Sequence, residues 1–272
     1  MMFMLLGCLS LYAADNDLIT KQITIKLEKA GTLPDRIASS KKYKITNLKI
    51  IGEINGTDLR MIREMAGRDY EGESTGGKLS VLDLSEAKIV EGGDCYHNGY
   101  YTSNCYTSND VIGNYAFEGC SGLTSLTLPT GITSIGYGAF IGCSGLTSLT
   151  LPAGITAIGS SAFYGCSGLT SIYVYAEKVP KIYISVFEGV DAKKCTLYVP
   201  MGTYDDYWLS DFGDYFENIV EFDVTGIDKT TTSTDVEEIA RYSVNGQRLS
   251  VPTKGLNIVK YSDGSVKKVA VR

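Results

Sequence analysis

The chain contains few of the residues on which catalysis and metal binding commonly depend. Of its 272 residues, one is His and one is Trp. Because His97 is the single imidazole, a His-based catalytic triad has only one candidate base, and a metal site with several His ligands is excluded. Six prolines beside 30 glycines also exclude a collagen-like chain and a Pro-rich disordered one.

Positive charge and long apolar runs are also scarce. The 25 Lys and Arg residues are outnumbered by 31 Asp and Glu residues, which gives a formal net charge of −6. This balance argues against a nucleic-acid partner, because nucleic-acid-binding domains carry a basic surface. No apolar run reaches the roughly 18 residues of a membrane-spanning helix, so we expect no membrane span. The length suits one large domain or two small ones.

The first 14 residues predict export. They read MMFMLLGCLSLYAA before the chain becomes polar at Asp15, and this short apolar stretch is typical of a signal peptide. Ala13 and Ala14 offer a cleavage site. As an alternative, the run Leu5-Leu6-Gly7-Cys8 resembles a bacterial lipobox that would make Cys8 the lipidated residue. Either interpretation predicts a cell-surface or extracellular protein.

Internal repetition is the clearest feature of the sequence. Residues 112–134 (IGNYAFEGCSGLTSLTLPTGITS) return with few changes as residues 135–157, a period of 23 residues. Residues 158–180 keep the first half of the copy, and a fourth, degenerate copy begins near Lys181. Repetition at a fixed period is typical of proteins built by stacking one small unit.

Each copy predicts one short strand. Leu123, Leu126 and Leu128 follow the pattern L-x-x-L-x-L, and the next two copies repeat it. Alternation at the last two positions indicates a strand with one buried face, and so short a strand cannot bury that face alone. Stacked copies provide a continuous parallel sheet and core. The predicted fold class is therefore an α/β-type leucine-rich repeat solenoid with short parallel strands.

The strand pattern also occurs outside the clear copies. It is present in residues 45–50 and 79–84, and residues 197–199 match its last positions. We therefore expect the sheet to run from near residue 45 to near residue 200. Between the first two of these strands, a helix is expected over residues 57–66.

The cysteines fall into two groups. Cys120, Cys143 and Cys166 occupy the same position in successive copies, and we expect a ladder of small buried side chains there rather than a metal site. Cys95 and Cys105 flank a Tyr-rich loop and could close it with a disulfide, which an exported protein would retain.

The repeated pattern I-G-x-x-A-F-x-G-C-S-G-L-T-S-L-T-L-P resembles the BspA-like leucine-rich repeats, also called the Treponema pallidum type. The likeness is closest over residues 112–174. Residues 45–67 and 78–85 look like the N-terminal segment of Bacteroidetes members, and residues 196–207 look like their C-terminal cap. The resemblance implies a secreted or cell-surface protein of a host-associated bacterium. It also implies adhesion to host matrix proteins or protein–protein recognition.

The C-terminal tail predicts a small all-β module. Asn245-Gly246 between strand-like runs is a hairpin signal, and residues 255–260 and 266–271 are two further strands. The pattern Y-x-x-x-G-Q-x-L followed by G-x-N-I-V-K resembles the C-terminal sorting domains of type IX secretion cargo. That likeness implies an export or attachment signal read by secretion machinery; the alternative is a module that only packs against the solenoid.

These observations divide the chain into six segments. They are a signal peptide (1–14), an N-terminal cap with degenerate repeats (15–110), the BspA-like repeats (111–200), a C-terminal solenoid cap (201–224), a linker (225–236) and the β-rich tail (237–272).

Two surfaces are candidates for binding. The first is the strand face that points away from the core, where Ser125, Thr127, Ser148, Thr150, Ser171 and Tyr173 would form a neutral, hydroxyl-bearing ladder for a protein or glycan. The second is the loop that carries Tyr96, Tyr100, Tyr101 and Tyr106, because Tyr combines contact area with a polar tip. A uniform repeat surface without a ligand is the alternative for the first, and a merely decorated insertion is the alternative for the second.

No catalytic set with a supporting context emerges. A nucleophile pair of His97 with Cys95 or Cys105 is conceivable, but we expect His97 to be an exposed loop residue. The acidic residues between 205 and 217 do not have EF-hand spacing, and we expect a solvated, negatively charged cap. We therefore predict a non-enzymatic recognition or adhesion protein without cofactor, metal or catalytic residues. The alternative is a structural envelope component without a host ligand.

Overall fold

The computed structural model describes residues 18–98, 105–223, 238–243, 248–249, 251, 253–261 and 266–271. The chain divides into two compact units, the first ending at Phe222 and the second beginning at Asp223. The predicted signal peptide, the whole of the predicted linker, Tyr100 and Tyr101 lie outside the described residues. No helix in the described ranges is both long and apolar enough to cross a membrane.

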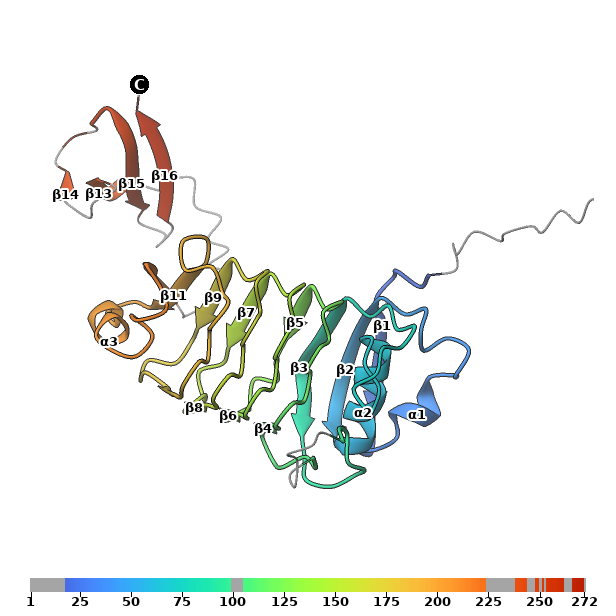
Figure 1. Ribbon diagram of the computed structural model, residues 1–272. Helices are drawn as coiled ribbons and strands as arrows, with labels where there is room; N and C mark the ends of the chain where they lie inside the picture. Colours follow the sequence, from blue (N-terminus) through green and yellow to red (C-terminus); the bar gives the residue numbers. More distant parts are fainter. Residues whose placement is uncertain are drawn as a thin grey trace, which may run out of the picture. The chain divides into compact units, whose positions relative to one another are not determined.

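The first unit is a parallel β-solenoid, which confirms the predicted fold class. Its main sheet has eight strands in the order β1-β2-β3-β5-β7-β9-β11-β12, and every neighbouring pair is parallel. The strands are β1 (Ile23–Leu27), β2 (Asn47–Ile54), β3 (Val81–Ile89), β5 (Ser125–Thr127), β7 (Ser148–Leu151), β9 (Ser171–Val174), β11 (Thr196–Pro200) and β12 (Asn218–Phe222). Figure 1 shows β1, β2, β3, β5, β7, β9 and β11 side by side in this order.

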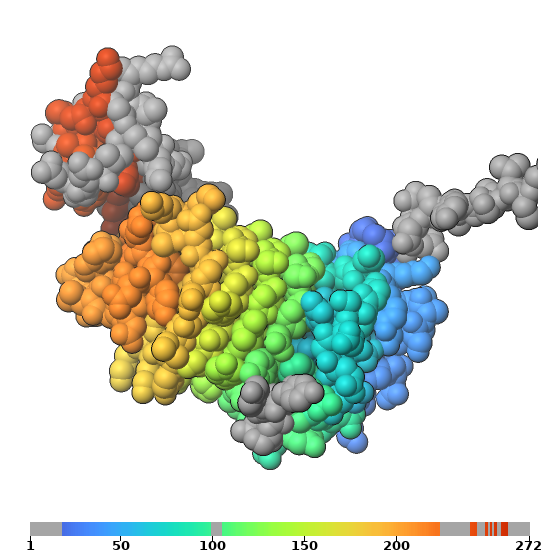
Figure 2. Space-filling view, in the orientation of Figure 1, coloured from blue at the N-terminus to red at the C-terminus, as the bar shows by residue number. Residues whose placement is uncertain are grey.

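Register between the copies follows the period of 23. Ser125 pairs with Ser148, which pairs with Ser171, so equivalent side chains stand in rows along the solenoid. In the space-filling view, the successive copies form adjacent bands from green to orange (Figure 2).

The sheet is longer than the predicted span of residues 45–200. It begins at β1, with Ile23, and ends at β12, with Phe222. Neither strand carries the L-x-x-L-x-L pattern, because β1 alternates Ile and Leu with Thr and Lys, and β12 reads NIVEF. β1 and β12 are edge strands, and each pairs with one neighbouring strand only. They are strands because of this pairing and not because of a repeat pattern in their sequence.

A second, narrow sheet forms the opposite wall of the solenoid, and the repeat pattern did not predict it. Its order is β10-β8-β6-β4, and each strand has two residues: β4 (Val111–Ile112), β6 (Ser134–Ile135), β8 (Ala157–Ile158) and β10 (Lys181–Ile182). The isoleucine of every strand is buried. A glycine follows the isoleucine of β4, β6 and β8. It allows neighbouring copies to approach closely, since a Cβ on Gly159 would lie 2.7 Å from the backbone carbon of Gly136.

Aromatic and cysteine ladders fill the space between the two sheets. Phe117, Phe140, Phe163 and Phe187 are buried and stack in sequence, with ring centroids 5.0–5.5 Å apart and planes within 6° of parallel. The three equivalent cysteines are buried as expected. The thiol of Cys143 donates to the carbonyl of Phe117 at 3.1 Å, and burial raises the pKa of the Cys120 thiol to about 11. Such a thiol stays protonated and behaves as a small apolar side chain.

Among the residues described for this unit, three helices lie at its ends, and Figure 1 shows α1 and α2 at one end and α3 at the other. They are α1 (Leu33–Arg36), α2 (Gly56–Met65) and α3 (Tyr204–Trp208). Helix α2 confirms the helix predicted over residues 57–66. Asn55 caps its N-terminus, since its side chain accepts from Thr57 N at 3.1 Å while the carboxylate of Asp58 accepts from Asn55 N at 2.9 Å.

The second unit is a four-stranded antiparallel sheet in the order β14-β13-β15-β16. The strands are β13 (Glu238–Ser243), β14 (Arg248–Leu249), β15 (Gly255–Tyr261) and β16 (Val266–Val271). This agrees with the predicted strands, and β13 and β14 pair as a hairpin would; the Asn245-Gly246 turn lies outside the described residues. Buried Asn257 accepts from Thr253 N at 3.1 Å and from Arg241 Nη1 at 3.2 Å.

Replacing Phe140 with Ala should lower the free energy of unfolding by about 3–5 kcal/mol, because it removes a ring that is packed on both sides and leaves a cavity. Urea unfolding followed by circular dichroism measures the change. Tyr164→Ala, a matched change at an exposed ring in the next copy, should stay within about 0.5 kcal/mol of the parent. Equal losses in the two variants would contradict a stacked core.

Candidate functional site

The predicted hydroxyl ladder lies on one face of the main sheet. Its six residues alternate with buried residues of β5, β7 and β9 and therefore point away from the core. Ser125 and Thr127 are exposed, and the other four are half-buried. The hydroxyl of Ser171 donates to that of Ser148 at 3.1 Å, so neighbouring rungs are also linked to each other.

An aromatic cluster continues this face on the C-terminal strands. Tyr173 on β9 stacks on Tyr198 of β11, with ring centroids 4.4 Å apart and planes 8° from parallel. Phe222 of β12 meets Tyr173 and Tyr175 edge-on, at 5.7 and 5.1 Å. Of these rings, sequence reasoning assigned only Tyr173 to the face. The alternation at Leu197-x-Val199 could have placed Tyr198 beside it.

The N-terminal end of the same face is charged. Lys49 on β2 pairs with Asp83 of β3 at 3.3 Å and with Glu86 at 2.6 Å. Hydrogen bonds to these carboxylates raise the pKa of Lys49, despite a smaller opposing effect of desolvation. The face therefore changes from ion pairs through hydroxyls to aromatic rings along the solenoid.

The tyrosine loop differs from its prediction. Tyr96 is fully buried, its hydroxyl donates to Asn114 O at 2.9 Å, and burial raises its pKa to about 12. It fits because Gly113 has no side chain: a Cβ there would collide with the Tyr96 hydroxyl. Tyr106 is 58% exposed and remains a candidate contact residue.

A disulfide joins Cys95 to Cys105 at the base of this loop. The prediction that His97 is an exposed loop residue is wrong, because the closed loop carries it into the interior, where it is 5% exposed. Its Nε2 lies 2.9 Å from a carboxylate oxygen of Glu118, and its Nδ1 lies 3.3 Å from Nη2 of Arg63.

These two contacts assign the tautomer of His97. A guanidinium only donates, so Nδ1 must accept from Arg63 and Nε2 must carry the proton that is donated to Glu118. Both ring nitrogens are engaged, and both loop cysteines are oxidised. The conceivable Cys/His nucleophile pair is therefore not assembled.

Arg63 is itself fully buried and links the N-terminal cap to the first clear copy. Its Nη1 donates to the carbonyls of Tyr115 and Ala116, at 2.7 and 3.1 Å. Burial lowers the pKa of this guanidinium, and nearby ionisable groups oppose the effect. It remains charged, because an Arg side chain does not lose its proton in proteins.

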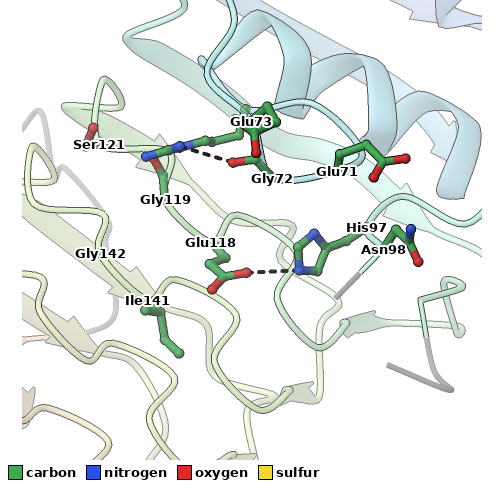
Figure 3. Close-up of a pocket in the computed structure, with 11 residues that line it drawn as sticks. Glu71, Gly72, Glu73, His97, Asn98, Glu118, Gly119, Ser121, Ile141 and Gly142 are labelled. Carbon is green, nitrogen blue, oxygen red and sulfur yellow. Dashed lines mark hydrogen bonds and ion pairs between the residues drawn. The ribbon is translucent and has the colours of Figure 1, made fainter. Parts of the chain in front are cut away.

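His97 and Glu118 line a cleft of about 970 Å³ beside this junction. Figure 3 shows Glu71, Glu73, Asn98, Ser121 and Ile141 around the same space. Arg68 forms another part of the wall and is held by backbone carbonyls, through Nε to Gly119 O at 3.0 Å and Nη1 to Gly72 O at 3.1 Å. Among the described residues, no three His, Cys, Asp or Glu side chains are grouped as metal ligands.

Comparison with known families agrees with the geometry. Residues 94–211 match the family model of the BspA type leucine rich repeat region, in six copies. The match covers less than half of the chain, and over these residues the chain is similar to BspA-type leucine-rich repeats. No curated protein matches the chain. BspA-type repeat proteins are usually surface-exposed or secreted, and repeat solenoids of this kind are typically non-enzymatic scaffolds for protein–protein interaction.

Glu118→Gln should make the unfolding free energy less sensitive to acid. The hydrogen bond from His97 lowers the pKa of Glu118 below its ordinary 4.5, against a smaller opposing effect of burial. The folded protein then binds fewer protons than the unfolded chain, so this stabilisation is present above pH 4.5 and is lost as the pH falls through the lowered pKa.

Urea unfolding of the parent and the Gln variant at a series of pH values tests this. The difference between them should be largest near neutral pH and should narrow in acid. Glu188→Gln provides the matched control, because Glu188 occupies the equivalent, exposed position in the fourth copy. A difference for Glu118→Gln that is independent of pH would contradict the assigned pair.

Proposed function

We propose that the protein is a non-enzymatic, secreted or cell-surface recognition protein that binds a protein partner on the outward face of its main sheet. One observation carries the proposal. From β5 to β12, the described side chains on this face are hydroxyls, aromatic rings, Pro200, Asn218 and Val220, without a charged group among them. Interface centres are likewise depleted of charge and enriched in aromatic residues.

The aromatic cluster of Tyr173, Tyr175, Tyr198 and Phe222 provides the energetic centre. Tyrosine offers a large contact area, loses little side-chain entropy on binding and keeps a polar tip. These rings are already packed against one another, so their side chains lose little conformational entropy on binding. The hydroxyl ladder adjoins them with hydrogen-bonding groups that need no charged partner.

The ion pairs of Lys49 lie at the other end of the face, so the two ends of this surface differ in polarity. A partner that matches the aromatic end with apolar groups and the charged end with polar groups would bind in one orientation. Tyr106, which directly follows Cys105 of the disulfide, is a second candidate contact. We propose host matrix proteins as the partner class; a structural envelope component without a host ligand is the competing function.

Tyr198→Ala should weaken partner binding about tenfold or more, because it removes one ring of the stacked pair. The measurement is saturation binding of the purified protein to a panel of immobilised extracellular matrix proteins. Tyr164→Ala is the matched control, since Tyr164 is an exposed tyrosine outside this face, and its affinity should change less than about twofold. Absence of saturable binding by the parent protein to every member of the panel would favour the envelope component.

Removal of residues 237–272 should abolish surface display if the tail is a sorting or attachment signal for secretion machinery. Surface labelling of intact cells, compared with total protein by immunoblot, measures the effect. The truncated protein should accumulate inside the cell while circular dichroism shows that its solenoid is still folded. Unchanged display would refute the sorting role and leave recognition by the sheet face untouched.

A further inference from the structure

A second surface lies at the C-terminal end of the solenoid, apart from the sheet face. Four large apolar side chains are exposed there within nine residues: Met201 (51%), Tyr204 (39%), Trp208 (46%) and Leu209 (84%). Tyr204 and Trp208 are one helical turn apart on α3, and their rings stack with centroids 6.3 Å apart and planes 7° from parallel. We call these four residues the α3 patch.

The backbone beneath the α3 patch is firmly held. The buried ring of Tyr207 lies between Tyr204 and Trp208 in sequence but points the other way, and its hydroxyl donates to Ala176 O at 2.6 Å. One carboxylate oxygen of Glu221 accepts from the backbone amides of Gly202 and Tyr204, at 2.8 and 3.0 Å. The exposed rings are therefore presented by an anchored helix, and clustered apolar surface of this kind marks interaction sites.

The segment of chain that carries the α3 patch is acidic. Residues 195–222 contain six acidic side chains and no Lys, Arg or His. The formal charge of this segment is therefore −6, the same as the net charge of the whole chain. Five of the six are exposed: Asp205, Asp206, Asp211, Asp214 and Glu217. An apolar centre with an acidic rim is complementary to a cationic segment that carries apolar side chains on one side.

We propose that the α3 patch binds a cationic amphipathic polypeptide segment of a partner protein. Apolar side chains of the segment pack on Trp208 and Leu209, and its Lys or Arg residues pair with the acidic rim or stack on the indole. A second copy of this chain would bring two identical acidic rims together, and an anionic lipid surface would be repelled in the same way. The charge therefore favours a basic protein segment over both.

The sole tryptophan of the chain reports directly on this site. The probe is a synthetic Leu/Lys peptide with leucines on one face of a helix, titrated into the full protein while the fluorescence of Trp208 is followed. A saturable blue shift is expected, with an affinity that falls as salt is added. A peptide of the same composition with its leucines scattered, and one with Glu in place of Lys, should each bind at least about tenfold more weakly.

Variants locate the binding. Leu209→Ser should weaken binding of the Leu/Lys peptide about tenfold, whereas Ile184→Ser, at an exposed isoleucine elsewhere in the first unit, should leave it unchanged. Trp208→Ser, measured by calorimetry, should weaken it at least as much as Leu209→Ser. Tyr198→Ala should retain peptide binding, which separates this site from the proposed sheet-face function.

Three results obtained without lipid would overturn the proposal. They are equal binding of the helical and scattered peptides, retained affinity in Leu209→Ser, and concentration-dependent dimerisation of the parent that Leu209→Ser abolishes. A blue shift with anionic vesicles but none with the helical peptide would also overturn it, because a lipid surface would then be the occupant.

Discussion

The first unit depends on one constraint: a 23-residue copy can bury its apolar side chains only against the copies on either side of it. The four phenylalanine rings show this directly, since each inner ring is covered on both faces by its equivalents. Close approach is part of the same constraint. Gly136 and Gly159, which follow narrow-sheet isoleucines, leave no room for a Cβ, because each lies directly against the backbone of the preceding copy.

The ends of the stack need a different solution, because the last copy has no equivalent neighbour. At the C-terminal end, Phe187 is covered by Phe212, Tyr215 and Phe216. At the N-terminal end, Arg63 donates to the carbonyls of the first clear copy and to His97, which in turn donates to Glu118. One cap thus covers the core with aromatic rings. The other covers it with aliphatic side chains of β2, β3 and α2, and adds a buried polar network beside an open cleft.

The sequence predicts those parts that repetition specifies. The leucine, phenylalanine and cysteine positions recur every 23 residues, so their burial follows from stacking alone, and the six ladder residues share a face because strands alternate. Prediction from the sequence fails where contacts between residues far apart in the chain determine whether a side chain is buried. His97 is buried by partners 34 residues before it and 21 residues after it, and Tyr96 is buried because Gly113 leaves it space. The edge strands β1 and β12 and the two-residue strands are likewise defined by pairing rather than by local pattern.

The near-identity of the copies over residues 112–157 has an evolutionary consequence. Duplication or deletion of one whole copy would recreate the same Ser-to-Ser register and the same phenylalanine contact on both sides of the junction. Such a change would move the cleft beside His97 and the α3 patch apart or together by one strand spacing, about 4.8 Å. Gain or loss of whole copies can therefore change the distance between the cleft and the α3 patch in fixed steps, while the residues of both sites stay the same.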